Sequence, residues 1–320
     1  MSLAAEKSDS SSLVPPGRDK AVSILGVPLG YGTSMAGVDM GPAALRVARL
    51  NQRIGSLGYS VRDLGDLRLE RPQAVPQQTD RLKYVQEISA ACEQLAREVE
   101  EIKTAGELPI VLGGDHSIAI GSIAGVASYY RKREESLGLI WFDAHADMNT
   151  PETTPSGNIH GMPLAVLLGF GTHELTSVAG FSPKLDPALS VHIGARDLDP
   201  GERELIHKLR IRFITMREID ERGMSACMDE AINIASRANA GYSVTFDVDV
   251  LDPGDAPGSG TLVRGGLTYR EAHLAMEKIA EAGGMQSLEV VEINTALDVN
   301  NKTAELGVEL ILSALGKTIL

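Results

Sequence analysis

The sequence has few cysteines and no long apolar run. Two cysteines in 320 residues, Cys92 and Cys227, are too few for the disulfide framework of a small secreted protein. No apolar stretch approaches the roughly 20 residues that a membrane-spanning helix needs. Residues 1–20 lack the apolar segment of a signal peptide and the Arg-rich pattern of a transit peptide. These absences predict a soluble, cytoplasmic protein whose Ser- and Pro-rich residues 1–20 form a disordered tail.

Positive charge is also scarce. The chain has 30 Lys and Arg residues against 43 Asp and Glu residues, which gives a formal net charge of −13. Nucleic acids and anionic membranes bind mainly through phosphate contacts with Lys and Arg, so this balance argues against both as partners. Cationic ligands and metal ions fit the charge better.

Apolar runs of strand length alternate with amphipathic segments from residue 21 to the end. The runs lie at 21–28, 108–114, 137–144, 189–195, 242–249 and 287–293. Between them, apolar residues recur every three or four positions from Leu82 to Ile102, which predicts a helix with one apolar face. Strands that are almost wholly apolar predict an α/β fold, with a mainly parallel sheet covered by helices on both faces. We expect residues 21–320 to form a single domain.

Five of these runs end in acids or histidines. In a parallel α/β sheet the ligand site lies beyond the carboxyl ends of the strands, so these ends should face one space. They read LGGDHS, WFDAHAD, HIGARDLD, TFDVDVLD and VVEIN.

Two apparent nucleotide motifs fail on spacing. After Gly30 and Gly32, the third glycine of a dinucleotide fingerprint would be residue 35, which is Met. The segment 316–318 reads GKT, but the earlier glycine of a phosphate loop would be residue 311, which is Ile.

The DAHAD segment at 143–147 is the strongest metal-ligand pattern. If the chain stays extended there, Asp143, His145 and Asp147 share one face. Two further aspartates stand two residues apart at 247 and 249, and His116 follows another strand. Each piece alone has an ordinary explanation, since Asp-His-Ser is also a good helix N-cap. Their combination at the strand ends favours a metal site.

Charge supports this interpretation. Asp143, Asp147, Asp247 and Asp249 together carry four negative charges, and carboxylates that lie so close do not all stay ionised unaided. Two divalent cations would neutralise them, with bridging aspartates and a separation of about 3.5 to 4 Å. Oxygen-rich ligation without thiolates favours manganese, while ligand type leaves nickel, cobalt and iron open. A water shared by two such ions becomes hydroxide near neutral pH, which predicts metal-assisted hydrolysis.

Four motifs together resemble the ureohydrolases, the binuclear manganese amidinohydrolases. They are GGDHS at 113–117, DAHAD at 143–147, SGNIHG at 156–161 and SVTFDVDVLDP at 243–253. The resemblance covers residues 21–320 and is strongest to bacterial arginases, through GVDMGPAALR at 37–46 and NTPETTPSGNIHGMP at 149–163. It implies a three-layer αβα sandwich with about eight parallel strands, two Mn²⁺ per chain, and a homotrimer or homohexamer.

The resemblance also assigns residues to the two metal ions. One ion would be held by His116, Asp143, Asp147 and Asp247, and the other by Asp143, His145, Asp247 and Asp249.

Catalytic and substrate-binding roles follow from the same motifs. The catalytic residues are expected to be His160, a proton shuttle, Glu292, which pairs with the guanidinium, and Asp147. The expected substrate-binding residues are Asn149, Thr154 and Ser156 for the carboxylate, with Asn158 beside them; Asp199 for the α-amino group, with Glu202 nearby; and Thr261.

The chain departs from the arginase pattern beside the expected site. In the loop 30–36, GYGTSMA replaces an Asp and a pair of basic residues, and Val250, Leu262 and Thr295 replace Gly, Pro and Pro.

Three candidate functions therefore remain open. L-Arginine hydrolysis to L-ornithine and urea is expected first. The second is the same chemistry on agmatine, guanidinobutyrate or another guanidino acid. The third is a silent metal-binding protein or a single-zinc amide hydrolase related to deacetylases.

Overall fold

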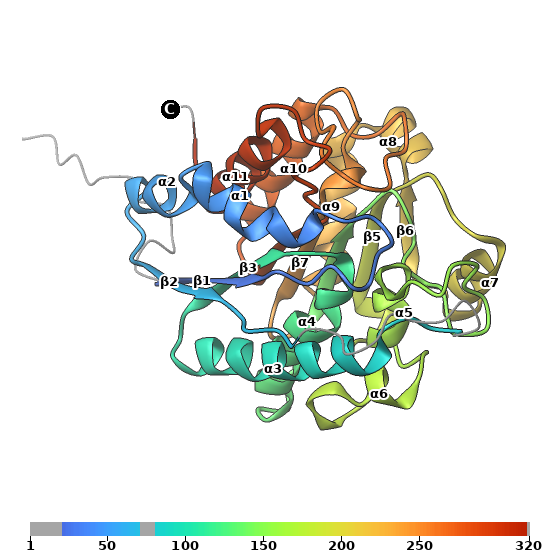
Figure 1. The fold of residues 1–320 in the computed structure, drawn as a ribbon. Helices are drawn as coiled ribbons and strands as arrows, with labels where there is room; N and C mark the ends of the chain where they lie inside the picture. Colours follow the sequence, from blue (N-terminus) through green and yellow to red (C-terminus); the bar gives the residue numbers. More distant parts are fainter. Residues whose placement is uncertain (1–20, 71–80, 319–320) are drawn as a thin grey trace, which may run out of the picture.

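The computed structural model describes residues 21–70 and 81–318, and the tail expected at 1–20 lies outside them. Within this part of the chain, eight strands form one parallel sheet in the order β2-β1-β3-β8-β7-β4-β5-β6 (Figure 1). Their bounds are β1 Val22–Val27, β2 Val61–Asp66, β3 Leu108–Gly113, β4 Gly138–Phe142, β5 Ser190–Ala195, β6 Arg212–Thr215, β7 Tyr242–Asp247 and β8 Met285–Val291.

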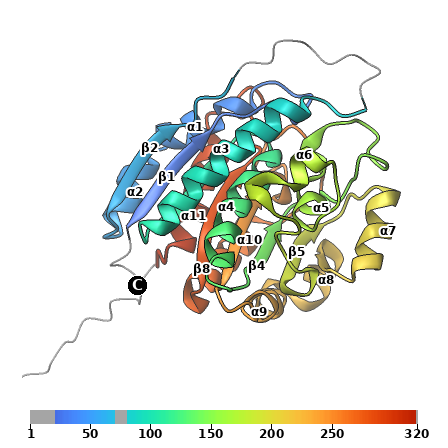
Figure 2. The same cartoon turned by 90° about the horizontal axis from the view of Figure 1, so that it is seen from below.

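Helices cover both faces of the sheet and make three layers (Figures 1 and 2). One face carries α1 Gly41–Val47, α2 Leu50–Ser56, α8 Met216–Arg222, α9 Met224–Ala235, α10 Tyr269–Ala282 and α11 Lys302–Ala314. The other carries α3 Val85–Thr104, α4 Ala119–Arg131 and α5 Pro163–Leu167, with α6 His173–Thr176 and α7 Pro200–Leu209 beside them. Short 3-10 turns are η1 Val38–Met40, η2 His116–Ile118, η3 Ile159–Gly161, η4 Val178–Gly180, η5 Pro187–Leu189 and η6 Val248–Val250. None of the described helices is long and apolar enough to cross a lipid bilayer.

The predicted α/β class and the six strands predicted from apolar runs are confirmed. The sheet is parallel at every strand pair, and its central strands are buried on both faces. This burial explains why β4 reads GLIWF, with no polar residue.

The two edge strands of the sheet, β2 and β6, were not predicted from the sequence. The sequence of β2, VRDLGD, is half charged and mostly exposed, while β6 has only four residues. An edge strand needs no apolar run because only one neighbour covers it, and so it leaves a weak signal.

His192 is a buried polar residue at the centre of β5. Its ring stacks on Phe213 with centroids 4.3 Å apart, and neither ring nitrogen makes a well-aligned hydrogen bond with the described residues. Burial disfavours the charged form and lowers the pKa of His192 to about 4. The folded protein therefore keeps this imidazole neutral at neutral pH.

This burial predicts a pH-dependent stability. Below its ordinary pKa of 6.5, His192 takes up a proton in the unfolded chain, whereas in the folded chain it does so only near pH 4. Acidification from pH 7.5 to 5 should therefore cost the folded state on the order of 1–2 kcal/mol through this residue. His192→Phe should flatten the pH dependence of the unfolding free energy over this range, measured by urea denaturation. The exposed His207→Gln serves as the control, and equal slopes in wild type and His192→Phe would contradict the assignment.

Candidate metal centre and substrate cavity

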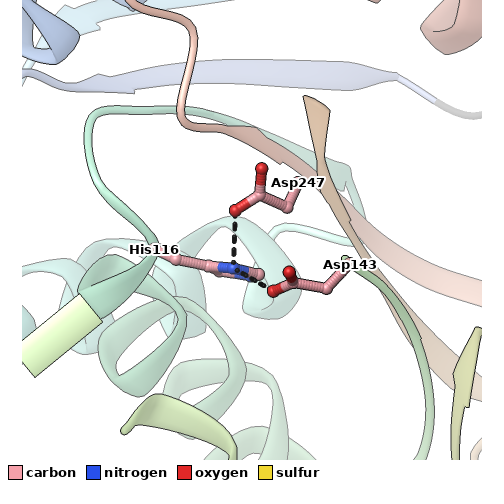
Figure 3. Close-up of side chains that lie close together, drawn as sticks. All are labelled: His116, Asp143 and Asp247. Atoms are coloured by element: carbon pink, nitrogen blue, oxygen red, sulfur yellow. Dashed lines mark ion pairs between the residues drawn. The ribbon is translucent and has the colours of Figure 1, made fainter. Parts of the chain in front are cut away.

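Two clusters of potential metal ligands lie side by side at the carboxyl edge of the sheet. The first is made by His116, Asp143 and Asp247, and the second by Asp143, His145 and Asp249, so the two share Asp143. Figure 3 shows one end of the His116 ring facing the carboxylates of both Asp143 and Asp247. Nδ1 of His116 lies 3.1 Å from Oδ2 of Asp143 and 3.2 Å from Oδ2 of Asp247. The ligand residues predicted from three separate strand ends are therefore brought together.

Asp147 also lies beside the first cluster, and within the second cluster His145 pairs with both aspartates. Oδ2 of Asp147 is 3.1 Å from Nδ1 of His116. Nδ1 of His145 is 3.0 Å from Oδ2 of Asp249 and 3.5 Å from Oδ1 of Asp143. All six predicted metal ligands thus surround one space.

Donors of the surrounding chain hold the aspartates in place. The amide of His145 donates to Oδ1 of Asp143 at 2.7 Å, and that of Asp249 donates to Oδ1 of Asp247 at 2.8 Å. Oδ1 of Asp249 accepts from the amide of Ala144 at 3.1 Å, and its Oδ2 accepts from Thr261 at 3.0 Å. A hydrogen bond that holds one carboxylate oxygen in place also sets the direction of the carboxylate group. The aspartates are therefore preorganised as a ligand set.

The ring of His116 is oriented from both sides. It stacks on Trp141 with centroids 4.3 Å apart, and its Nε2 lies 2.9 Å from the hydroxyl of Thr245 on β7. This second contact favours the tautomer with hydrogen on Nε2, which leaves the Nδ1 lone pair facing the aspartates. Asp115 meanwhile caps η2 by accepting from the amide of Ser117. The DHS segment is therefore both a helix cap and a source of a ligand.

The extended backbone that would place the three DAHAD side chains on one face is not present. The alternating pattern required an extended chain over residues 143–147, but β4 ends at Phe142 and Asp147 has a φ of 53°. The chain bends at Ala144 and His145 and takes a left-handed conformation at Asp147, so Asp147 reaches the cluster from a loop rather than from a strand face. The structure brings Asp143, His145 and Asp147 to one space, but through a bent and not an extended backbone.

The carboxylates of the centre repel one another strongly. Burial and the charge of Asp143 raise the pKa of Asp147 to about 8, and burial with the charges of Asp249 and Asp143 raises the pKa of Asp247. Burial alone would lower the pKa of His116, but its contacts with Asp143, Asp147 and Asp247 raise it. The cluster therefore holds excess negative charge that protons or cations must neutralise.

The residues fit bound cations. Within the described chain, Nδ1 of His116 and Oδ2 of Asp147 are buried without a well-aligned hydrogen bond. Buried polar atoms almost always have partners, so two such atoms that face each other across a ligand cluster indicate a site for an ion. Oxygen and imidazole donors without thiolates suit a hard or borderline divalent metal.

His160 and Glu292 lie beside this centre. Nδ1 of His160 is 3.1 Å from Oε1 of Glu292, which also accepts from the amide of His116 at 2.9 Å. Burial opposes protonation of His160, but the hydrogen bond and charge of Glu292 prevail and raise the pKa of His160 to about 9. Glu292 itself has a φ of 64°, an unusual conformation for a glutamate that commonly marks a functional site.

A cavity of about 250 Å³ opens over the centre. Its wall contains His116, His145, Asp147, Asp247 and Asp249 of the ligand set, together with His160. It also contains every predicted substrate-binding residue, namely Asn149, Thr154, Ser156, Asn158, Asp199, Glu202 and Thr261. Of the predicted site residues, Asp143 and Glu292 are not in the wall, and both are almost wholly buried behind it.

The far end of the cavity is built from linked polar residues. Nδ2 of Asn149 donates to Oδ2 of Asp199 at 2.8 Å. Asp199 is the N-cap of α7, where it forms a capping box with Glu202. Glu202 accepts from the amides of Asp199 and Met148, at 2.8 and 3.0 Å. Both carboxylate oxygens of Glu202 are thus committed to the backbone, which places it as a support for Asp199.

Two residues at this edge were not predicted from the sequence. Asp197 lines the cavity, and Arg196 donates to the carbonyls of Asp249 and Val263 at 2.7 and 2.8 Å. Arg196 thereby fixes the turn that carries Asp249. The resemblance to arginases implies a role for Asp199 and none for Asp197, although Asp197 follows the same strand two residues earlier.

The unusual loop at 30–36 is anchored to the centre at Gly32. Its amide donates to Oδ2 of Asp115 at 2.8 Å, and its carbonyl accepts from the amide of His160 at 3.2 Å. A Cβ at residue 32 would collide with Asp115 and Ser117, so the close approach requires glycine.

The fold and this centre define a class of protein: a parallel α/β sandwich with a carboxylate and imidazole ligand set at the carboxyl edge of its sheet. Comparison with known proteins places the chain within that class. A profile of the arginase family matches residues 20–316. The chain belongs to the arginase family, and it is an enzyme of the ureohydrolase class, an amidinohydrolase.

Individual relatives agree over nearly the full chain. The arginase of Bacillus caldovelox is 49% identical over 94% of this chain and 100% of its own length. The arginase of Bacillus subtilis strain 168 is 47% identical with the same coverage. The crystal structure of arginase from Bacillus subtilis superposes with a TM-score of 0.88 at 47% identity, over 94% of this chain and 100% of that one.

Metal binding to the purified metal-free protein should release protons. Asp147, with a pKa of about 8, is mainly protonated at pH 7 and must ionise to bind a cation. Calorimetric titration with Mn²⁺ in two buffers of different ionisation enthalpy should show release of at least about one proton per chain at pH 7.

Release from Asp147 should decline as the pH rises above about 8, and Asp147→Asn should remove that contribution. The exposed Asp229→Asn is the matched control. Equal heats in both buffers at pH 7 would refute this description of the cluster.

Proposed function

We propose that the protein hydrolyses L-arginine to L-ornithine and urea with two manganese ions per chain. The observation that supports this most directly is the two-ended cavity, with the ligand clusters at one end and the Asn149–Asp199 pair at the other. A guanidino amino acid has a matching pattern, with a guanidinium at one end and α-amino and α-carboxylate groups at the other. The relatives named arginase support the same substrate.

The ligands proposed for one ion are His116, Asp143, Asp147 and Asp247, and for the other Asp143, His145, Asp247 and Asp249. Ions held by these residues would lower the pKa of bound water and so supply a hydroxide near neutral pH for attack on the guanidinium carbon. The aspartates supply the charge that retains the ions, and Asp143 belongs to both clusters.

Glu292 and His160 are proposed to act on the substrate. Oε1 of the buried Glu292 carboxylate already accepts from the amide of His116 and contacts His160. Its negative charge would pair with the guanidinium and orient it. His160, with its pKa raised to about 9, is protonated at neutral pH and can donate to the departing amine. Its half-buried ring lies in the cavity wall, where protons can exchange with solvent.

Polar residues at the end of the cavity remote from the ligand clusters would bind the α-amino and α-carboxylate groups of the substrate. Asp199 carries a negative charge for the α-ammonium, and Glu202 holds it in place. Asn149, Thr154, Ser156 and Asn158 offer neutral polar groups to the α-carboxylate. The hydroxyl of Thr261 donates to Asp249, so its role in substrate binding would be combined with support of that ligand.

The family resemblance supports a proposed assembly, and the cysteine usage supports a proposed location. We propose a homotrimer or homohexamer, which sedimentation equilibrium would distinguish. A cytoplasmic location agrees with the two buried free cysteines, Cys92 and Cys227.

A substrate panel tests the proposed reaction. After separate loading with manganese, nickel and cobalt, L-arginine should give urea with the highest kcat/KM, above agmatine and 4-guanidinobutyrate. The physical reason is that only arginine fills both polar contacts at the far end. Preference for agmatine would favour the second candidate substrate class. No urea from any guanidino compound, with one metal or none per chain, would favour the silent or single-zinc alternative.

His160→Asn tests the proton donor separately. Asparagine can donate a similar hydrogen bond to Glu292 but cannot deliver a proton, so kcat for arginine should fall about 10²-fold with little change in KM. Metal content, measured by elemental analysis, should stay at the wild-type value. An unchanged kcat would remove His160 from the mechanism.

A further inference from the structure

The cavity wall is strongly acidic at both ends. Its described residues include six carboxylates, from Asp147, Asp197, Asp199, Glu202, Asp247 and Asp249, and neither a lysine nor an arginine. Two bound cations would offset the charge at the catalytic end only. An α-carboxylate at the far end would therefore meet Asp197 and Asp199 with only neutral groups of the wall to attract it.

A cation stands just behind the wall at this end. The Lys83 ammonium lies 2.7 Å from Oδ1 of Asn158, which lines the cavity, and 3.4 Å from the hydroxyl of Ser34. Lysine has only donors, so this contact also fixes which end of the Asn158 amide is the oxygen. Ser34 belongs to the loop in which the chain departs from the arginase pattern.

The backbone around Lys83 holds it against the substrate-binding segment. The amide of Lys83 donates to the carbonyl of Gly157 at 3.0 Å, and Nε of Arg81 donates to the carbonyl of Pro151 at 2.5 Å. Gly157 has a φ of 72° and its packing against Arg81 leaves no room for a Cβ. Helix α3 begins at Val85, two residues after Lys83. The ammonium thus belongs to a segment of chain that is hydrogen-bonded to the substrate-binding segment at Pro151 and Gly157.

We propose that Lys83 is a specificity-determining residue that selects substrates with a carboxylate at the end remote from the guanidinium. This inference rests on the proposed function and deepens it. Asn149, Thr154, Ser156 and Asn158 contribute dipoles, whereas Lys83 adds a full positive charge behind Asn158. That charge offsets Asp197 and Asp199 and favours a carboxylate over a neutral group at the same position.

The test compares L-arginine with L-argininamide, which keeps the guanidinium and the α-amino group but lacks the carboxylate charge. In the manganese-loaded holoenzyme, Lys83→Met should raise KM for arginine about fivefold, as expected for a partly screened ion pair, with kcat unchanged. The inhibition constant of argininamide against arginine should stay constant or fall. Lys83→Arg keeps the charge and should restore KM close to the wild-type value.

Lys208→Met is the matched control, because it removes the same charge from an exposed position on α7. It should leave both constants unchanged, which separates a local effect from a change in net charge. Unfolding temperatures should agree among the variants. The proposal is overturned if KM for arginine does not change in Lys83→Met, or if the constants for arginine and argininamide rise equally, as a purely structural role would require.

Failure of the proposed function would look different. A wild-type protein that releases no urea from arginine contradicts the reaction but still permits calorimetric titration with arginine and argininamide. In that case Lys83 keeps its assigned role only if Lys83→Met weakens arginine binding selectively.

Discussion

Mutual repulsion among four buried aspartates is the constraint on which the rest of the structure depends. Asp143, Asp147, Asp247 and Asp249 face one space with two imidazoles, and burial raises the cost of their charge. Backbone amides at the ends of β4 and β7 hold the carboxylates in this unfavourable proximity. The sheet can supply those amides because its buried central strands β4 and β7 are neighbours and end at the same edge. The energy stored in this arrangement is available to bind cations.

Several residues serve the fold and the site together. Asp115 and Asp199 cap the starts of η2 and α7, and Asp247 caps η6. Each of them also belongs to the metal centre or to its surroundings. A helix cap must lie at the end of a strand-to-helix connection, and in a parallel sheet these connections border the ligand site. A residue at such a position can therefore cap a helix and belong to the ligand site at the same time.

The sequence predicted the central strands of the sheet and the acids and histidines that gather at their ends. It did not predict the two edge strands or the bent backbone beside the ligand clusters. Apolar strands and the acids that follow them are local patterns, so β4 and β7 with their aspartates could be read directly. β2 and β6 have no such pattern because an edge strand is covered on fewer sides. The left-handed bend at Asp147 depends on contacts with distant residues, and so does the clamp of Arg196 on the turn at Asp249. Neither leaves a signal in its own segment.

The left-handed backbone at Asp147 and Glu292 limits how far the stability of this enzyme can be raised without loss of activity. Glycine would relax either position, since it adopts positive φ without steric cost, yet it would also delete a carboxylate of the site. The left-handed backbone costs about 1 kcal/mol or more of strain at each position. A substitution that removed this strain would raise stability and lower activity. Selection for heat resistance should find its gains in the surface loops and helix caps, and leave these two strained residues as they are.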